Sequence, residues 1–428
     1  AGVDVGNRAN DINPDDIATI NVLKGGAATA LYGLRGANGV VVITTKRGQQ
    51  GALSVNFTST AGIEEVNKFP DVQDKYTQGY RGLYDPASFW PSWGPTVEAA
   101  RQIDPTHPAE LYNHFRDAYE TGNQFRNSLS FSGGNETITF LSSLSHLKHE
   151  GVLPFTDFEN FSARLNTDVR LSEKFKTGAN FNYSKSGGQR YNADRFNESL
   201  SYWSPRWDVR DFRKPDGTMQ TYGNNNPIYG AATNQLEDDV NRFIGSVNFS
   251  YEPLNWLDLS YRFGVDTYTD DRTRTAPGPR GIAGERVYED NGQGFVYEYT
   301  TKFRSINSTF IAAANTSFGE NFNATFRLGH ELYDEKVNSF GVEGNELTVF
   351  DYFDLRNAKL LTARDDQSKY RLMGFFGEAT VDYRNFLFLT LTGRNDITST
   401  LRDNNNSFFY PSASLSYVFS EHLDLPSF

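Results

Sequence analysis

The residues best placed to do chemistry lie in one segment near the start of the chain, INPDDIATINVLKGGAATALYGLRGANGVVVITTKRG, at residues 12–48. Glycines beside a lysine bind phosphate where they lie between a strand and the N-terminus of the helix that they open. Lys24-Gly25-Gly26 has that position, but the remaining Walker spacing is missing and no Lys-Ser or Lys-Thr opens the helix. Gly33 to Gly39 leads back from the expected helix to a strand. We therefore predict that these small residues serve close packing and that the segment binds no phosphate.

No other group of residues has the spacing of a catalytic or metal site. The chain has no Cys, which excludes disulfides and thiolate metal sites. His146 and His149 are three apart in a strand-like stretch, a spacing that puts them on opposite faces. The acidic stretches Asp365-Asp366 and Glu289–Gly292 have too few oxygen ligands for Ca²⁺, and we assign both to solvated loops. The sequence therefore predicts no catalytic residue, no metal site and no cofactor, and a protein that is not an enzyme.

Four of the five Trp residues fall in two long stretches that lack a strand pattern. Trp90 and Trp93 lie in the first stretch, and Trp203 and Trp207 lie in the second. Exposed flat rings suit stacking against sugars or packing on a partner protein. The alternatives are a core that the loops form by themselves, or contact with a capping protein. We take these four residues as candidate ligand or partner contacts.

The composition of the chain is typical of a membrane β-barrel. Its 428 residues include 34 Phe and 23 Tyr, yet the mean hydropathy is -0.57. No apolar run is long enough to be a membrane-spanning helix. A transmembrane barrel combines polar and aromatic residues in this way, because its strands alternate between two faces and its rims carry aromatic girdles. The net charge of -12, without a basic stripe, argues against nucleic acid as a partner.

The positions of polar and apolar residues give the elements. From Ala52 onward they alternate with the period of a strand that has two different faces. About twelve strands are predicted, each near the ten residues that a tilted strand needs to cross a bilayer, at 52–62, 125–134, 136–149, 158–171, 174–186, 241–252, 255–268, 302–317, 321–334, 369–383, 386–398 and 409–419. Short turns alternate with long loops at roughly 63–124, 187–240, 269–301 and 335–368, as in outer-membrane barrels. The alternative is a large soluble β-sandwich or propeller, although a propeller would repeat a motif at its blade period and none is found.

The opening segment has its own elements. Asn13 can cap a helix, Pro14 suits the first helical position, and the Asp pair after them favours the positive end of a helix. Strands are predicted over 17–23 and 40–45. Between them we expect a short helical turn over 27–32, which Gly33 is well placed to end.

The segment 13–48 closely resembles the C-terminal half of the plug domain of the SusC/RagA family of TonB-dependent outer-membrane transporters. The family signature reads NP-D-I, VLKG, A-ALYG, R-ANGV and ITTK-G, and the positions that carry the match are Asn13, Pro14, Lys24, Gly25, Tyr32, Gly33, Arg35, Asn38 and Gly39. Leu34 and Gly36 depart from the Ser and Ala that are more frequent in the family. The stretches 241–266, 371–396 and 408–421 are similar to strands of the family's barrel.

The resemblance implies that the chain is an internal piece of an all-β membrane protein. Residues 1–50 would be the C-terminal part of a small α/β plug domain inside the lumen. Residues 51–428 would be the N-terminal part of a large antiparallel transmembrane β-barrel, with about 22 strands in the whole protein and about 12 here.

The resemblance also implies a function and partners. The family imports bulky nutrients, glycans or oligopeptides, across the outer membrane of Gram-negative bacteria. It works with a SusD-like surface lipoprotein and with TonB, ExbB and ExbD, and it is surrounded by outer-membrane lipid. The alternative is a structural or assembly subunit of a larger outer-membrane complex, without a transport role of its own.

Overall fold

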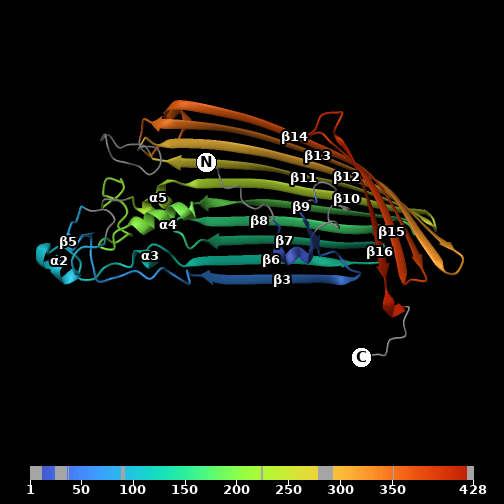
Figure 1. Cartoon of the computed structure of the whole chain (residues 1–428), viewed down its shortest axis with the longest axis horizontal. Helices are drawn as coiled ribbons and strands as arrows, with labels where there is room; N and C mark the ends of the chain where they lie inside the picture. Colours follow the sequence, from blue (N-terminus) through green and yellow to red (C-terminus); the bar gives the residue numbers. More distant parts are fainter. Residues whose placement is uncertain are drawn as a thin grey trace.

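A computed structural model describes residues 12–24, 36, 38–87, 92–222, 225–277, 293–349 and 351–421. Its main element is one antiparallel sheet of twelve strands, which follow chain order apart from the step between β3 and β6. Figure 1 shows the strands side by side. They are β3 (Gly51–Glu64), β6 (Gly122–Gly134), β7 (Ile138–Glu150), β8 (Asp157–Arg170), β9 (Phe175–Arg190), β10 (Leu236–Leu254), β11 (Leu257–Ala276), β12 (Phe295–Phe318), β13 (Phe322–Leu347), β14 (Ala358–Tyr383), β15 (Leu387–Thr398) and β16 (Ser407–Tyr417). The alternation of polar and apolar residues predicted all twelve.

The sheet has one apolar face and one polar face. On the apolar face Phe57 lies opposite Leu129, which in turn lies opposite Leu144. Each of the twelve strands exposes at least one large apolar side chain on this face, for example Leu53, Val55, Phe125, Leu144, Phe161, Phe181, Phe243, Phe263, Phe310, Leu328, Phe375, Leu391 and Leu415. The other face carries a buried row of serines in register across four strands: Ser128, Ser145, Ser162 and Ser184. The one-residue alternation of the sequence therefore becomes a two-faced wall.

Several strands are longer than their apolar residues predict. β11 to β14 run on through residues that were predicted to lie in the loops 269–301 and 335–368, so that only 348–357 separate β13 from β14. Asp365 and Asp366, predicted in a loop, lie instead in β14 opposite Phe340 and Ser339. The difference has a physical cause: backbone pairing continues there although polar and apolar side chains no longer alternate regularly, so the hydropathy of the sequence carries no strand period.

The first two long loops contain the helices. The first loop holds the hairpin of β4 (Gly79–Tyr80) and β5 (Leu83–Tyr84), then α2 (Val97–Ile103) and α3 (His114–Asp117); the second holds α4 (Ala193–Tyr202) and α5 (Pro227–Thr233). The 3-10 turns η4 (Leu355–Asn357) and η5 (Phe419–Glu421) lie further along the chain. Figure 1 shows α2 to α5 gathered at one end of the strands, at its left. Phe196, Leu200 and Val209 form the buried core of this loop region.

The N-terminal segment forms a separate two-stranded sheet, the N-terminal hairpin. It begins with the 3-10 turn η2 (Pro14–Asp16), whose cap is the Asn13 side chain, and continues as β1 (Ile17–Leu23) and β2 (Val40–Thr45). The cap and both strands were predicted at these residues, whereas the helical turn predicted at 27–32 lies outside the described residues. In the described ranges, no helix has the length and hydrophobicity needed to span a bilayer.

Candidate functional site

The start of the N-terminal hairpin is bonded to the polar face of the wall. The Ser128 hydroxyl on β6 donates to Asp15 Oδ2 at 2.8 Å and accepts from Asn13 Nδ2 at 3.4 Å. The Ser143 hydroxyl on β7 donates to Asp16 Oδ2 at 2.9 Å. Two serines of the wall thus hold the two carboxylates with which the hairpin begins.

The end of the hairpin is bonded to the same face one strand further along. Asn166 Nδ2 on β8 donates to the Lys46 carbonyl at 3.2 Å, and Arg164 Nη1 donates to the Asp16 carbonyl at 3.5 Å. Arg47 Nη1 lies 3.2 Å from Asp168 Oδ1 in a half-exposed ion pair. Because the Lys46 amide also donates to the Asp16 carbonyl, both ends of the hairpin meet the wall at one place.

The chemistry of this contact is almost wholly polar. Ile20, Val22 and Val41 of the hairpin strands are exposed and do not cover the wall. A neutral hydrogen bond adds only about 0.5–1.5 kcal/mol and one to a charged group about 1.5–3 kcal/mol, because water can replace either. Burial raises the pKa of the Asp16 carboxyl, while the Ser143 hydrogen bond and the Arg164 charge act against that rise. A carboxylate that is costly to bury therefore sits at the centre of the contact.

Gly48 is a further residue of this contact, and the sequence reasoning did not single it out. A Cβ at this position would lie 2.4 Å from the Phe140 carbonyl oxygen on β7. The chain leaves the hairpin by passing directly against the wall backbone, and only glycine allows that approach. The signal was present in the sequence, since Gly48 closes the glycine-rich segment.

The structure describes five of the nine signature positions. Asn13 and Pro14 form the cap and first residue of η2, and Lys24 directly follows β1. Asn38 and Gly39 precede β2, where Gly39 has a φ of +91° and its amide bonds the Gly36 carbonyl. The other four lie outside the described residues: Gly25, Tyr32, Gly33 and Arg35.

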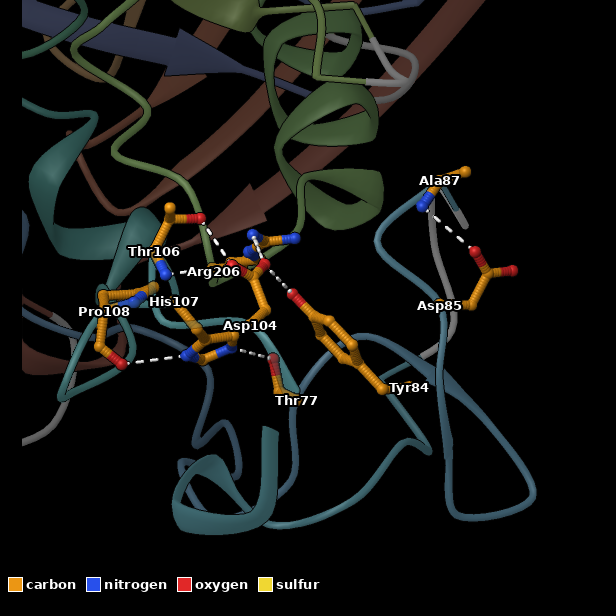
Figure 2. A network of polar contacts seen from close by, with 9 residues as sticks. All are labelled: Thr77, Tyr84, Asp85, Ala87, Asp104, Thr106, His107, Pro108 and Arg206. Atoms are coloured by element: carbon orange, nitrogen blue, oxygen red, sulfur yellow. Dashed lines mark hydrogen bonds and ion pairs between the residues drawn. The ribbon is translucent and has the colours of Figure 1, made fainter. Parts of the chain in front are cut away.

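A second group of polar residues joins the two long loops, as Figure 2 shows. Arg206 Nη2 from the second loop lies 2.5 Å from Asp104 Oδ2 in the first, and the Tyr84 hydroxyl donates to the same oxygen at 2.8 Å. The Arg206 side chain is only 3% exposed. Its guanidinium lies 4.2 Å from the centre of the Trp207 ring and 5.3 Å from that of Tyr84, so two rings and a carboxylate fix it.

The titrating groups around Arg206 have shifted pKa values. Hydrogen bonds from Thr106 and Tyr84, together with the Arg206 charge, hold the pKa of Asp104 below its ordinary value. Burial, followed by the hydrogen bond to Asp104, raises the pKa of Tyr84 to about 12. At neutral pH the group is therefore a carboxylate, a guanidinium and a neutral phenol, which is an arrangement for holding two loops together.

His107 completes the loop junction. Its Nδ1 lies 2.8 Å from the Pro108 carbonyl and must donate, so Nε2 of the neutral ring accepts from the Thr77 hydroxyl at 2.7 Å. Burial lowers the pKa of this ring. His107 thus acts as a fixed hydrogen-bonding residue of the first loop.

The candidate Trp residues have different surroundings. Trp203 is 3% exposed within the loop core and donates its Nε1 to the Trp207 carbonyl at 2.9 Å. The Trp207 ring stacks on Tyr222 with centroids 4.1 Å apart. Trp93 is 69% exposed beside the β4–β5 hairpin, and Trp90 lies outside the described residues. Trp203 and Trp207 are therefore used inside the loops, and the exposed ring of Trp93 is free to meet another molecule.

The two histidines of β7 lie apart, as their spacing predicts. His146 Nε2 lies 2.6 Å from Glu159 on β8, and His149 Nε2 lies 3.0 Å from Glu64 on β3. Within the part of the chain that the structure describes, no three acidic or His side chains are grouped so that they could hold a metal ion.

A buried ionic group on the polar face joins β13 to β16. Arg394 on β15 donates to Glu331 on β13 at 2.9 Å and to Asp396 at 2.7 Å, and the Tyr410 hydroxyl on β16 donates to Asp396. Arg394 and Asp396 are both buried. This group could not be predicted from local patterns, because its members lie up to 79 residues apart in the sequence.

Comparison with known proteins gives the fold a context. The chain is 28% identical to the TonB-dependent receptor P26 of Formosa agariphila and 26% identical to the TonB-dependent receptor SusC of Bacteroides thetaiotaomicron. Each match covers 96% of this chain and 41% of the relative, so the chain spans about two fifths of the length of these relatives. No protein-family model matches the chain.

A solved structure of the RagAB peptide transporter has a similar fold. It superposes with a TM-score of 0.77 at 19% identity, over 98% of this chain and 50% of that one. The resemblance that the sequence suggested is thereby confirmed: over nearly its whole length the chain is similar to TonB-dependent receptors, SusC among them, and it has the antiparallel barrel fold of such proteins. These relatives are receptors and a peptide transporter by name.

Proposed function

We propose that this chain is part of a TonB-dependent importer of bulky nutrients in the outer membrane of a Gram-negative bacterium. In this proposal residues 1–50 are the C-terminal part of the plug domain and residues 51–428 are the N-terminal part of the barrel wall. The observation that carries it is the N-terminal hairpin, which is held by hydrogen bonds to the polar face of a sheet whose other face is apolar and exposed.

The polarity of the two faces supports this assignment. An exposed apolar sheet face of this extent is unfavourable in water and favourable in lipid. The polar face would then line the lumen, and the hairpin on it would lie in the path of a solute. A contact made of exchangeable hydrogen bonds suits a plug that TonB, with ExbB and ExbD, has to move.

The partners and the substrate class belong to the same proposal. A SusD-like lipoprotein would cap the end of the barrel that carries α2 to α5, and the exposed Trp93 ring would meet that lipoprotein or the ligand. Glycans and oligopeptides are the proposed substrates. Support comes from the relatives, of which one is SusC and another is a peptide transporter by name.

The proposal is tested by locking the hairpin to the wall. The full-length protein would carry Asp15→Cys and Ser128→Cys, joined in cells by a short thiol-reactive cross-linker, and the lack of native Cys in this chain keeps its background low. We expect uptake of the nutrient to stop. A matched control joins Ser145→Cys to Ser162→Cys, whose hydroxyls lie 2.7 Å apart within the wall, and should leave uptake intact.

Undiminished uptake by the locked hairpin would refute the plug assignment. If neither the locked nor the unlocked protein supports uptake, while deletion of the protein disperses a larger outer-membrane complex, the structural or assembly subunit becomes the better account.

A further inference from the structure

Five basic residues form a patch on the apolar face of the sheet, over β12, β13 and β14. Arg304 lies opposite Lys336, and Lys336 lies opposite Lys369, so three cations stand in one row across neighbouring strands. Lys302 and Arg371 lie two residues from this row on the same face, because side chains alternate along a strand. We call these five residues the cationic patch.

The cationic patch has few partners of its own. Asp334 is its one close carboxylate in the described chain, 3.6 Å from Arg304 and 2.6 Å from Arg371. The three lysines have no ion pair with a described residue. The next acid on this face, Asp271 on β11, lies diagonally from Lys302, and Glu298 and Asp365 lie four residues or about 13 Å further along their strands. Five cations beside Asp334 and Asp271 leave three excess positive charges, in a chain whose net charge is -12.

This arrangement is unfavourable unless an anion binds there. Like charges directly opposite one another on neighbouring strands destabilise a sheet. The row of Arg304, Lys336 and Lys369 therefore destabilises the free protein, and a bound anion would remove this destabilisation. Lysine offers a point charge and arginine a planar pair of donors, and both suit phosphate.

The place of the patch on the sheet indicates where the anion comes from. Toward the short turns, most outward side chains are apolar, with Ser308 and His330 among them: Ile306, Phe310, Leu332, Leu328, Met373 and Phe375. From Phe322 to Leu332 on β13, and from Met373 to Tyr383 on β14, there are 11 residues each, which is the length that a tilted strand needs to cross the hydrocarbon layer. The patch thus begins where the lipid-facing stretch ends, on the side of the long loops.

We propose that the cationic patch binds the phosphate groups of lipid headgroups in the membrane leaflet on the long-loop side. This inference rests on the proposed function, since it requires the apolar face to meet lipid. Long lysine and arginine side chains reach along an apolar surface to place their charge at headgroup level. The patch is a flat, exposed row at the edge of that surface, so phosphates presented side by side on lipids fit it better than a single phosphate in solution.

The test uses the full-length protein in a neutral detergent, titrated with lipid A as the phosphate-bearing lipid and with phosphatidylcholine for comparison. Native mass spectrometry gives the affinity for each lipid. The triple variant Lys302→Gln/Lys336→Gln/Lys369→Gln should bind lipid A about 100-fold more weakly than the wild type, at roughly fivefold for each lysine. Its affinity for phosphatidylcholine should not change.

A matched control keeps the test specific. Lys148 and Lys185 also lie on the apolar face, but each is 3.1 Å from a carboxylate, of Glu150 and Asp239 respectively. The variant Lys148→Gln/Lys185→Gln should bind lipid A like the wild type. Refolding yield and thermal unfolding of both variants, measured in the same detergent, report whether either fails to fold. Lipid A should raise the unfolding temperature of the wild type more than that of the triple variant, and an equal rise in both would count against the proposal.

Three results would overturn the inference. The triple variant binds lipid A as tightly as the wild type, both variants lose affinity equally, or inorganic phosphate at the same phosphorus concentration displaces the lipid completely. Failure of the proposed function looks different, because a wild-type protein that does not insert into vesicles at all shows that the apolar face meets something other than lipid.

Discussion

The N-terminal hairpin and the two long loops are both attached through carboxylates, but the attachments differ in kind. Asp15 and Asp16 of the hairpin meet serine hydroxyls on an otherwise polar wall, while the apolar side chains of the hairpin stay exposed. Asp104 of the first loop meets Arg206, which is buried against aromatic rings, one of them Trp207 beside the apolar loop core. The hydrogen bonds of the hairpin contact can be exchanged for water, whereas Arg206 at the loop junction is buried. We therefore expect the hairpin to be separable from the wall and the loop region to be rigid.

The largest effect that separates the two regions is expected from Trp203→Ala. Removing a buried indole from the loop core should cost about 3–5 kcal/mol of local stability. Proteolysis within 191–235 would speed up strongly, and amide exchange in the hairpin would stay as it is. A loop that remains protected from proteolysis in this variant would show that the core around Trp203 does not make the loop region rigid.

A smaller effect, confined to the N-terminal hairpin, is expected from Gly48→Ala. The added Cβ would overlap the Phe140 backbone, which should cost about 1–3 kcal/mol. Hydrogen exchange should then rise in β1 and β2 and at Ser143, but not in the loops. Unchanged exchange in both strands would mean that the chain passes the wall with more room than the geometry gives it.

Acidification should affect the two regions with opposite signs. The pKa of Asp16 is raised above its ordinary value of 3.8 by burial, so the folded contact binds the proton more tightly. The hairpin contact then gains stability as the pH falls through that raised pKa. The pKa of Asp104 is lowered by its hydrogen bonds, so the loop junction stays intact at pH values near 3.8 and is lost only as the pH falls through its own lower pKa.

Exchange rates of hairpin and loop amides, measured from neutral pH down to about pH 2, test both signs. Asp16→Asn should remove the pH dependence of the hairpin and leave that of the loops. Faster amide exchange in the hairpin on acidification would contradict the predicted difference between the two regions.

The smallest effect on stability is expected from Trp93→Ala. The ring is 69% exposed, so the free energy of unfolding should change by less than about 0.5 kcal/mol. Binding of ligand or of the capping lipoprotein should nonetheless weaken, since an exposed ring has most of its surface left to bury. Normal uptake and normal lipoprotein binding in this variant would remove Trp93 from the proposed contact surface.

The features that the sequence predicted are local ones. The twelve strands, the cap at Asn13 and the two hairpin strands all follow from alternation or capping within a few residues. The ends of β11 to β14 were not predictable in this way, because backbone pairing extends them beyond their apolar residues. The predicted strands therefore end where polar and apolar side chains no longer alternate.

Contacts between residues far apart in the sequence could not be predicted from local patterns either. Arg206 and Asp104 are 102 positions apart, and nothing near either residue marks the other. Trp93 and Trp203 belong to the same residue type in similar loop sequences, yet one is exposed and the other buried. Packing alone distinguishes them, so the sequence could nominate the Trp residues but could not assign their roles.

The most direct test of the account is the labelling of two adjacent residues in native membranes of cells whose outer membrane is permeabilised. Leu328 lies on the apolar face and is 69% exposed in this chain, while Arg327 lies on the polar face and pairs with Glu378. A water-soluble maleimide should label Arg327→Cys and leave Leu328→Cys unlabelled, because lipid covers the apolar face. Rapid labelling of Leu328→Cys would contradict the account, since it would mean that water reaches the face assigned to the membrane.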